Sequence, residues 1–247
     1  MKRVFILFFC FFKCAISPAQ EIVNLVLVGA NGVTENIKEA NSFIVVKKYP
    51  NSFQRLDYKI SEPLQKMRNY SDVNLTILEG KYLEYGADGT ITKSGYYQNN
   101  LKEKDWHYYN DTGKVILTEK FEKDLLIQTI NPDTVKKDEK KSDTFTKVES
   151  EATFEKGDKD WKKYLVKNLN GDVGNKSVKG GKVVVQFVVN TSGKCVDVFM
   201  QKSVEFVLDE EAIRIIENSP LWQSAFQDGR KVNAYRRQPI TFAKSQD

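Results

Sequence analysis

The chain has 247 residues, of which 40% are hydrophobic, 29% charged and 12% aromatic, a globular composition for one or two domains. Its 38 Lys and Arg against 33 Asp and Glu give a net charge of +5, which is too small at this length to indicate a nucleic-acid-binding protein. One histidine and three cysteines exclude a His-rich or Cys-rich metal site.

Residues 1–20 have the pattern of a cleaved secretory signal peptide. Lys2 and Arg3 precede the nine-residue apolar run Val4–Phe12, and small residues follow up to Ala19. The run is shorter than the roughly 17–25 apolar residues that span a bilayer. Cleavage near residues 19–20 would leave Cys195 as the one cysteine, so the mature chain would reach an oxidising compartment without an intrachain disulfide.

Residues 21–130 contain short apolar runs of alternating pattern, separated by turn residues, and are predicted to form antiparallel β-hairpins. The runs Ile22–Val28 and Ser42–Tyr49 are two of the expected strands. Asp88-Gly89 predicts a tight hairpin turn between Tyr82–Tyr85 and Ile91–Tyr97.

An internal repeat of 24 residues lies within this region. The repeat aligns Tyr82 with Trp106, Tyr85 with Tyr109, Gly89 with Gly113, and Tyr97 with Phe121. A single hairpin cannot bury its aromatic side chains, so neighbouring hairpins are expected to stack into one sheet.

Residues 79–126 resemble the MORN-variant repeats of the YwqK-type antitoxin-like family, although Asn100 and Asp124 replace the glycines that end its repeats. Such repeats serve as scaffolds. One function compatible with them is a structural envelope protein that binds cell-wall glycan or a membrane surface. An exposed aromatic surface of Tyr97, Trp106 and Tyr109 would then make the contact, although packing within the repeat core is the alternative role for these rings.

Residues 131–151 are interpreted as a solvated linker, because 11 of these 21 residues are charged and the signs are mixed. The following domain, 152–247, is predicted to have the order α-β-β-α-β, so the whole chain falls in the α+β class. Asp158 or Asp160 is expected to cap the first helix and Asp209 the second. Gly193 lies in the hairpin turn between two strands, and Pro220 ends the second helix.

The C-terminal domain resembles the TonB C-terminal domain family in the style of Bacteroidetes envelope proteins. Three strings carry the resemblance: KVVVQFVVNTSGKCVDVFMQKS, LDEEAIRIIENSPLW and DGRKVNAYRRQPITF. The chain departs from the family after the first helix, where Asn170–Gly174 replace a Tyr-Pro pair, and after Trp222, where the usual proline is missing. These departures put receptor engagement in doubt while leaving the fold plausible.

The resemblance implies a non-enzymatic protein that binds a partner by adding a strand to the edge of its last strand. The expected edge residues are Val232, Asn233, Ala234, Tyr235, Arg236 and Arg237. The implied partner is a segment of a TonB-dependent outer-membrane receptor or another envelope protein, and a homodimer through the last strand is also compatible. Arg236 and Arg237 could instead protect the edge from aggregation.

The signal peptide, cleaved near residues 19–20, predicts a location in the periplasm, with an uncleaved inner-membrane anchor facing the periplasm as the alternative. No catalytic residue, metal site or cofactor is predicted. Cys195 and His107 form the one available Cys/His pair, and they fall in different domains. The short apolar run and short linker favour a TonB-like module on a soluble periplasmic protein over a direct energy transducer.

Overall fold

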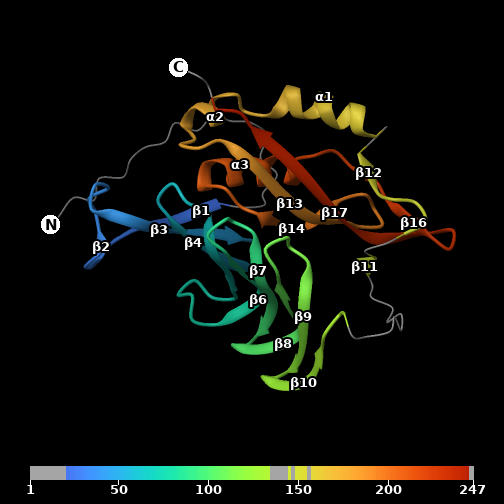
Figure 1. The fold of residues 1–247 in the computed structure, drawn as a ribbon, viewed down its shortest axis with the longest axis horizontal. Coiled ribbons are helices and arrows are strands. Elements are labelled where there is room, and N and C mark those ends of the chain that lie inside the picture. Colours follow the sequence, from blue (N-terminus) through green and yellow to red (C-terminus); the bar gives the residue numbers. More distant parts are fainter. Residues whose placement is uncertain (1–20, 134–143, 146–147, 155–156, 245–247) are drawn as a thin grey trace.

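The computed structural model describes residues 21–133, 144–145, 148–154 and 157–244, so the predicted signal peptide lies outside the described residues. The described part is mostly β-sheet with three helices, which is broadly consistent with the α+β class (Figure 1). No helix within it is long and apolar enough to cross a membrane.

A ten-stranded antiparallel sheet forms the N-terminal part, and its strand order β10-β9-β8-β7-β6-β5-β4-β3-β1-β2 follows the chain almost throughout. The strands are β1 (Glu21–Gly29), β2 (Gly32–Thr34), β3 (Ala40–Tyr49), β4 (Ser52–Lys59), β5 (Leu64–Tyr70), β6 (Leu78–Tyr85), β7 (Ile91–Gln98), β8 (Leu101–Tyr109), β9 (Val115–Glu122) and β10 (Leu125–Ile130). Consecutive strands pair because short turns suit antiparallel neighbours.

The 24-residue repeat corresponds to the hairpins β6–β7 and β8–β9. Their turn glycines Gly89 and Gly113 have φ of 79° and 73°, which a glycine adopts without steric cost. The links between hairpins use Asn100 and Asp124 in left-handed conformations, with φ of 69° and 67°. Asn and Asp tolerate this region better than other non-glycine residues, which explains how the repeat keeps its geometry where those glycines are replaced.

The C-terminal part is a smaller sheet with helices beside it. Its elements are β11 (Thr144–Phe145), β12 (Thr153–Phe154), α1 (Asp158–Asn168), α2 (Asp172–Lys176), β13 (Gly181–Val189), β14 (Cys195–Lys202), α3 (Phe206–Glu217), β15 (Trp222–Gln223), β16 (Ala225–Gln227) and β17 (Arg230–Phe242). The sheet order is β11-β17-β13-β14, with β16 pairing the start of β17. The sequence did not predict α2, β11, β12, β15 or β16, which are all five residues or shorter.

Both predicted helix caps differ from the structure. Helix α1 follows Gly157 and no side chain caps it. Helix α3 begins at Phe206 after the N-cap Glu205, so Asp209 lies within the first turn instead of at the cap. Asp209 is fully buried and hydrogen-bonded to groups outside the helix, a tertiary interaction that the local pattern of residues cannot reveal.

The segment 131–151, predicted as a linker, pairs in part with the C-terminal sheet. Residues Thr144 and Phe145 form β11, which pairs in parallel with β17. Ser150 then makes an antiparallel bridge to Phe226 in β16. The end of the predicted linker is therefore part of the C-terminal sheet.

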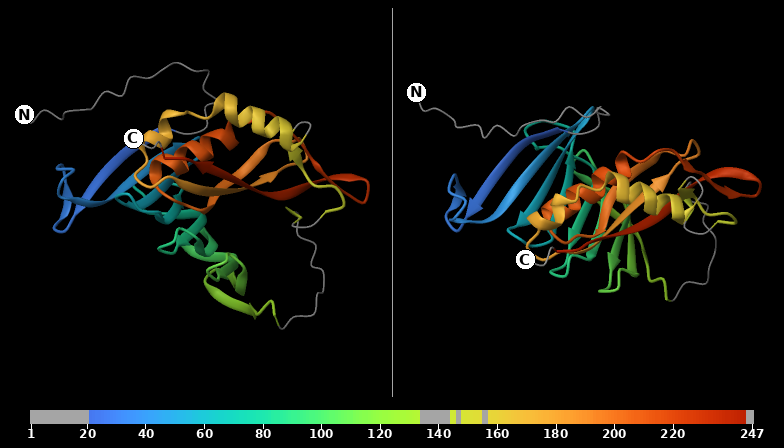
Figure 2. Two further views of the ribbon diagram at one scale, coloured as in Figure 1. Left: turned by 45° about the horizontal axis from the view of Figure 1, so that its top comes forward. Right: turned by 90° about the horizontal axis from the view of Figure 1, so that it is seen from above.

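The two parts of the molecule share one hydrophobic core. Leu56, Leu64 and Leu83 from the N-terminal sheet belong to the same buried cluster as Val185 and Leu208 from the C-terminal part. Figure 2 shows β6–β10 in a layer on one side of the C-terminal sheet and α1 on the other. The N-terminal sheet is thus a packed layer of the fold rather than a module on a tether.

Candidate functional site

Strand β17 is the site predicted for partner binding, and one of its sides is fully paired. Residues 234–242 pair in antiparallel register with β13, from Val189 opposite Ala234 to Gly181 opposite Phe242. At the beginning of β17, residues 230–232 pair with β16, and Asn233 and Ala234 pair in parallel with β11. Within the described residues, the remaining edge from Tyr235 to Phe242 has no neighbouring strand.

The predicted site residues fall on two faces of β17. Ala234 is buried in the core at 1% exposure, and Arg236 on the same face binds the Glu151 carboxylate at 2.9 Å. On the other face, the Asn233 Oδ1 accepts a hydrogen bond from the Thr191 backbone N–H.

The remaining predicted edge residues are accessible to different degrees. Arg237 is exposed, and its Nε donates to Gln186 Oε1 at 3.2 Å. Tyr235 and Val232 are half-buried, and burial raises the pKa of the Tyr235 hydroxyl. The part of β17 that has both a free edge and accessible side chains therefore begins at Tyr235. Of the six predicted edge residues, this part includes the last three.

The opposite edge of the C-terminal sheet, on β14, is covered at its C-terminal end by the first repeat hairpin. The Tyr85 hydroxyl donates to the Met200 carbonyl at 2.7 Å. The Ser203 N–H donates to the Gly89 carbonyl at 2.9 Å, and Thr90 forms an antiparallel bridge with Lys202. These contacts satisfy main-chain groups that a partner strand would otherwise pair with.

A buried polar cluster fixes this junction from inside. The Asp209 carboxylate accepts hydrogen bonds from the Tyr58 hydroxyl at 3.0 Å, the Val204 N–H at 3.0 Å and the Ser203 hydroxyl. Ser203 Oγ also accepts from the Leu64 N–H at 2.7 Å. Burial raises the pKa of Asp209 to about 7, while the three hydrogen bonds lower it.

A second polar contact lies beside this cluster. Lys47 of β3 is 2% exposed, and its Nζ lies 2.5 Å from Glu210 Oε1 on α3. Tyr58, Tyr85 and Lys47 were not predicted to contact the C-terminal part, because alternation within a strand shows that a residue faces a core but does not show which partner covers it.

The three aromatic residues predicted as a binding surface do not lie together on the outside. Trp106 is 1% exposed and packs against the rings of Tyr82, Tyr97 and Phe121. Tyr109 packs against the shared core and its hydroxyl bonds to Ser94 at 2.8 Å. Because Ser94 and Tyr97 are three positions apart in β7, Tyr109 and Tyr97 lie on opposite faces of the sheet.

The Cys/His pair is not assembled. His107 Nδ1 bonds to Thr118 Oγ1 at 2.9 Å within the N-terminal sheet, whereas Cys195 lies 3.7 Å from Ser219 Oγ in the C-terminal part. Burial raises the pKa of the Cys195 thiol to about 11, which favours the unreactive protonated form. No group of three or more potential metal ligands occurs among the residues that the structure describes.

Comparison with known families supports the interpretation of the C-terminal part. Residues 175–243 match the family model described as Gram-negative bacterial TonB protein C-terminal. Neither the curated proteins nor the solved structures gave a match to the chain. The matched region contains β13, β14, α3 and β17, and therefore both edge strands of the sheet. The match supports the TonB C-terminal family for residues 175–243, a family of non-enzymatic, protein-interacting domains.

Proposed function

We propose that this protein binds an envelope partner, a segment of a TonB-dependent outer-membrane receptor or a similar protein, by strand addition to β17 in the periplasm. The observation that carries the proposal is the free edge of β17 from Tyr235 to Phe242, on the side away from β13. This edge lies within the region that matches the TonB C-terminal family. Main-chain N–H and C=O groups at such an edge supply affinity, and alternate side chains supply specificity.

The contacts at the end of β14 favour the β17 edge. Both edges of an isolated three-stranded sheet would be open to an added strand. Here Tyr85 bonds to the Met200 carbonyl and Gly89 to the N–H of Ser203, the residue after β14, so part of the β14 edge is occupied. The N-terminal sheet would then limit strand addition at this end of β14 and leave the β17 edge as the longer free one.

Strand β11 supports a parallel orientation for the added strand. The chain's own Thr144 and Phe145 pair with Asn233 and Ala234 in parallel. This intrachain pairing supports a parallel orientation for a strand added at the β17 edge. A partner segment would continue along the edge from Tyr235 or replace β11.

The test is site-specific crosslinking in the native envelope. Cys195 is replaced by serine, and Arg237→Cys, on the open edge, is labelled with a benzophenone maleimide and irradiated. We expect an adduct with an extended segment of one outer-membrane receptor, identified by mass spectrometry. Adding Tyr235→Pro removes a backbone donor at the edge and should reduce the adduct about tenfold, if one or two main-chain hydrogen bonds are lost.

The matched control carries Lys194→Cys, an exposed position directly before β14. Its adduct should differ from that of Arg237→Cys and should not respond to Tyr235→Pro. Circular dichroism of the proline variant establishes that the fold is retained. If a folded Tyr235→Pro variant gives the same adduct in the same yield, strand addition to β17 is wrong.

A further inference from the structure

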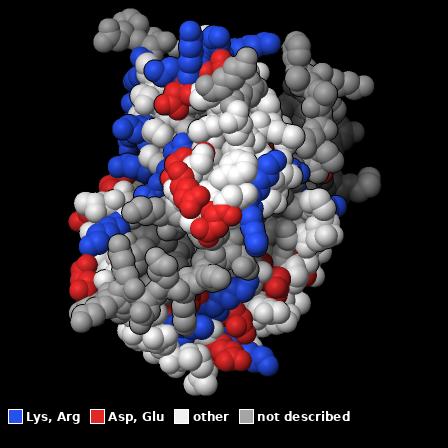
Figure 3. Space-filling model, turned by 90° about the vertical axis from the view of Figure 1, so that its right-hand side faces the viewer, with Lys and Arg blue, Asp and Glu red and all other residues white. Residues whose placement is uncertain are grey.

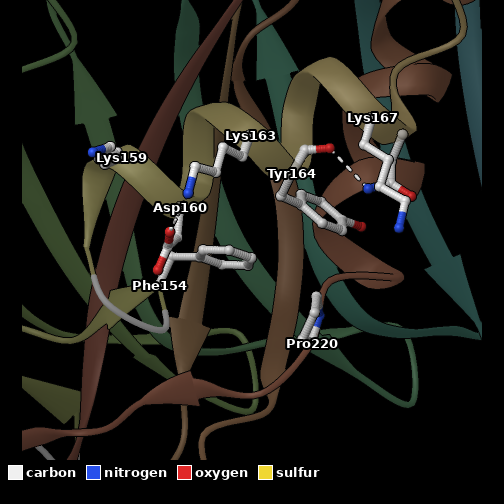
Figure 4. A pocket seen from close by; sticks show the side chains of 8 residues that line it. Phe154, Lys159, Asp160, Lys163, Tyr164, Lys167 and Pro220 are labelled. Atoms are coloured by element: carbon white, nitrogen blue, oxygen red, sulfur yellow. Dashed lines mark hydrogen bonds and ion pairs between the residues drawn. The ribbon is translucent and has the colours of Figure 1, made fainter.

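Helix α1 and the chain that follows α3 form a groove on the molecule's surface, far along the chain from the repeats. Its volume is about 820 Å³, and its lining includes Phe154, Lys159, Lys163, Tyr164, Lys167 and Pro220. Figure 4 shows Phe154 and Tyr164 beneath the helix, with the lysines along it. The groove lies outside residues 175–243, except for Pro220, and so is not a feature of the family match.

The aromatic wall of the groove is held in place. The Tyr164 hydroxyl donates to the Ile215 carbonyl on α3 at 3.1 Å. The ring centroids of Tyr164 and Phe154 are 5.3 Å apart, and Phe154 packs in turn on Trp161 and Trp222. The groove therefore has a preformed apolar wall, which reduces the ordering cost of binding.

The charge along the groove is positive and incompletely balanced. Lys159, Lys163 and Lys167 are all exposed. Asp160 lies 3.6 Å from Lys163, whereas Lys159 and Lys167 make no ion pair with any residue that the structure describes. Figure 3 shows lysine and arginine side chains gathered along the upper part of the molecule, the level at which α1 lies in Figure 1.

The spacing of these lysines matches that of an extended chain. Positions i, i+4 and i+8 rise about 6 Å per step along a helix axis. Side chains on one face of an extended strand repeat every second residue, or about 6.6 Å. Carboxylates at alternate positions of an extended segment can therefore face all three lysines in turn.

We propose that this groove binds an extended acidic segment of a partner protein, with carboxylates at every second position facing Lys159, Lys163 and Lys167. The residues between the carboxylates would face Tyr164 and Pro220, with Phe154 buried behind the Tyr164 ring. A peptide is favoured over an anionic membrane because the cationic side chains form a single row beside a concave wall, whereas a bilayer needs a flat surface. The proposal does not depend on strand addition to β17.

The probe is a fluorescein-labelled peptide, Thr-Glu-Thr-Glu-Thr-Glu-Thr, followed by fluorescence anisotropy with the whole mature chain. The triple variant Lys159→Gln, Lys163→Gln, Lys167→Gln should raise the Kd about tenfold, because each lost exposed ion pair is worth a fraction of a kcal/mol. A peptide of the same composition with its three glutamates consecutive should bind more weakly than the alternating one.

The matched control removes three other exposed lysines of the C-terminal part that do not line the groove: Lys162→Gln, Lys176→Gln and Lys179→Gln. This variant has the same net charge as the groove variant and should bind the alternating peptide within about twofold of the unmodified chain. Equal weakening in both variants would show attraction by net charge alone and overturn the proposal. Absence of peptide binding, or binding of phosphatidylglycerol vesicles that only the groove variant loses, would also overturn it.

Discussion

Gly89 is a residue at which the main chain of the repeat hairpin contacts the main chain of the C-terminal part. A Cβ atom built there would lie 2.0 Å from the Ser203 carbonyl oxygen, and the backbone of Gly89 has φ of 79°. Its own carbonyl accepts the Ser203 N–H. The turn that the sequence predicts at this position is therefore also a docking contact, which the sequence does not predict.

We expect Gly89→Ala to lower the free energy of unfolding by about 2–4 kcal/mol, because it combines left-handed strain with a main-chain clash. Gly229→Ala is the matched control, since Gly229 has φ of 69° and open space around it. The control should cost only about 1–2 kcal/mol. Urea denaturation of both variants measures the difference, and equal losses would contradict a docking role for Gly89.

Asp209 gives the junction a dependence on pH. Its pKa is raised from 3.8 to about 7, mainly by burial. Between these values the folded protein holds a proton on this group that the unfolded chain has released. Stability contributed by Asp209 is therefore greatest below about pH 4 and declines as pH rises to about 7.

In the variant Asp209→Asn, the free energy of unfolding should fall less between pH 4 and 7 than in the unmodified protein, by an amount of order 1–3 kcal/mol. The measurement is urea denaturation at several pH values. Glu217 contributes in the same pH range, because burial raises its pKa to about 7 as well. The informative quantity is therefore the difference between variant and unmodified protein in the slope of the free energy of unfolding against pH. Parallel pH profiles would mean that Asp209 is ionised in the folded state throughout, as its three hydrogen bonds favour.

At the scale of elements, the repeat hairpins are stabilised by an aromatic cluster of their own. Trp106 of β8 packs against Tyr82, Tyr97 and Phe121 on the face of the sheet opposite to Tyr109. Lys102 covers this cluster, with its Nζ 4.9 Å from the Trp106 ring centroid. A ring so enclosed stabilises the sheet instead of contacting a ligand.

Trp106→Ala should therefore lower the free energy of unfolding by about 3–5 kcal/mol, the range for large buried aromatic residues. Tyr97→Ala, which truncates a half-buried ring of the same cluster, should cost less. Denaturation monitored by circular dichroism compares the two. A small loss for Trp106→Ala would show that the cluster contributes little to the sheet.

Strand β11 occupies part of the edge that we propose for partner binding. Replacing Thr144 and Phe145 by proline prevents regular pairing with β17. If β11 competes with the partner, this variant should increase the Arg237→Cys adduct about threefold to tenfold, in line with roughly 1 kcal/mol of lost pairing. A decrease would mean that the partner builds on β11 rather than replacing it.

At the scale of the whole molecule, a core shared by both parts predicts one cooperative unfolding transition. The three tryptophans separate the two parts, because Trp106 lies in the repeats and Trp161 and Trp222 lie in the C-terminal part. Fluorescence of Trp161→Phe/Trp222→Phe reports on the first part, and that of Trp106→Phe on the second.

Because each variant also changes stability, each fluorescence transition is compared with circular dichroism of the same variant. We expect the two signals to coincide in both variants. Separate transitions within one variant would show that the repeats and the TonB C-terminal domain unfold independently, and that their contact adds little stability.

The sequence by itself determined the local structure. Alternation of apolar residues predicted β3 and β13, Asp88-Gly89 and Gly193 predicted hairpin turns, and the strings around Val183–Phe242 led to the TonB C-terminal family, which the match at 175–243 supports. These features depend on residues close in the chain, whose periodicity and turn chemistry are visible without the fold.

Only the tertiary structure decided which surfaces are covered. Asp209 resembles a helix cap in sequence, yet it bonds to Tyr58, 151 positions away. The charged segment around Thr144 resembles a free linker, yet its main chain pairs with β17. Main-chain hydrogen bonds carry no side-chain signature, and a buried face does not specify its partner. Which parts of the two sheet edges are covered therefore follows from packing between distant parts of the chain.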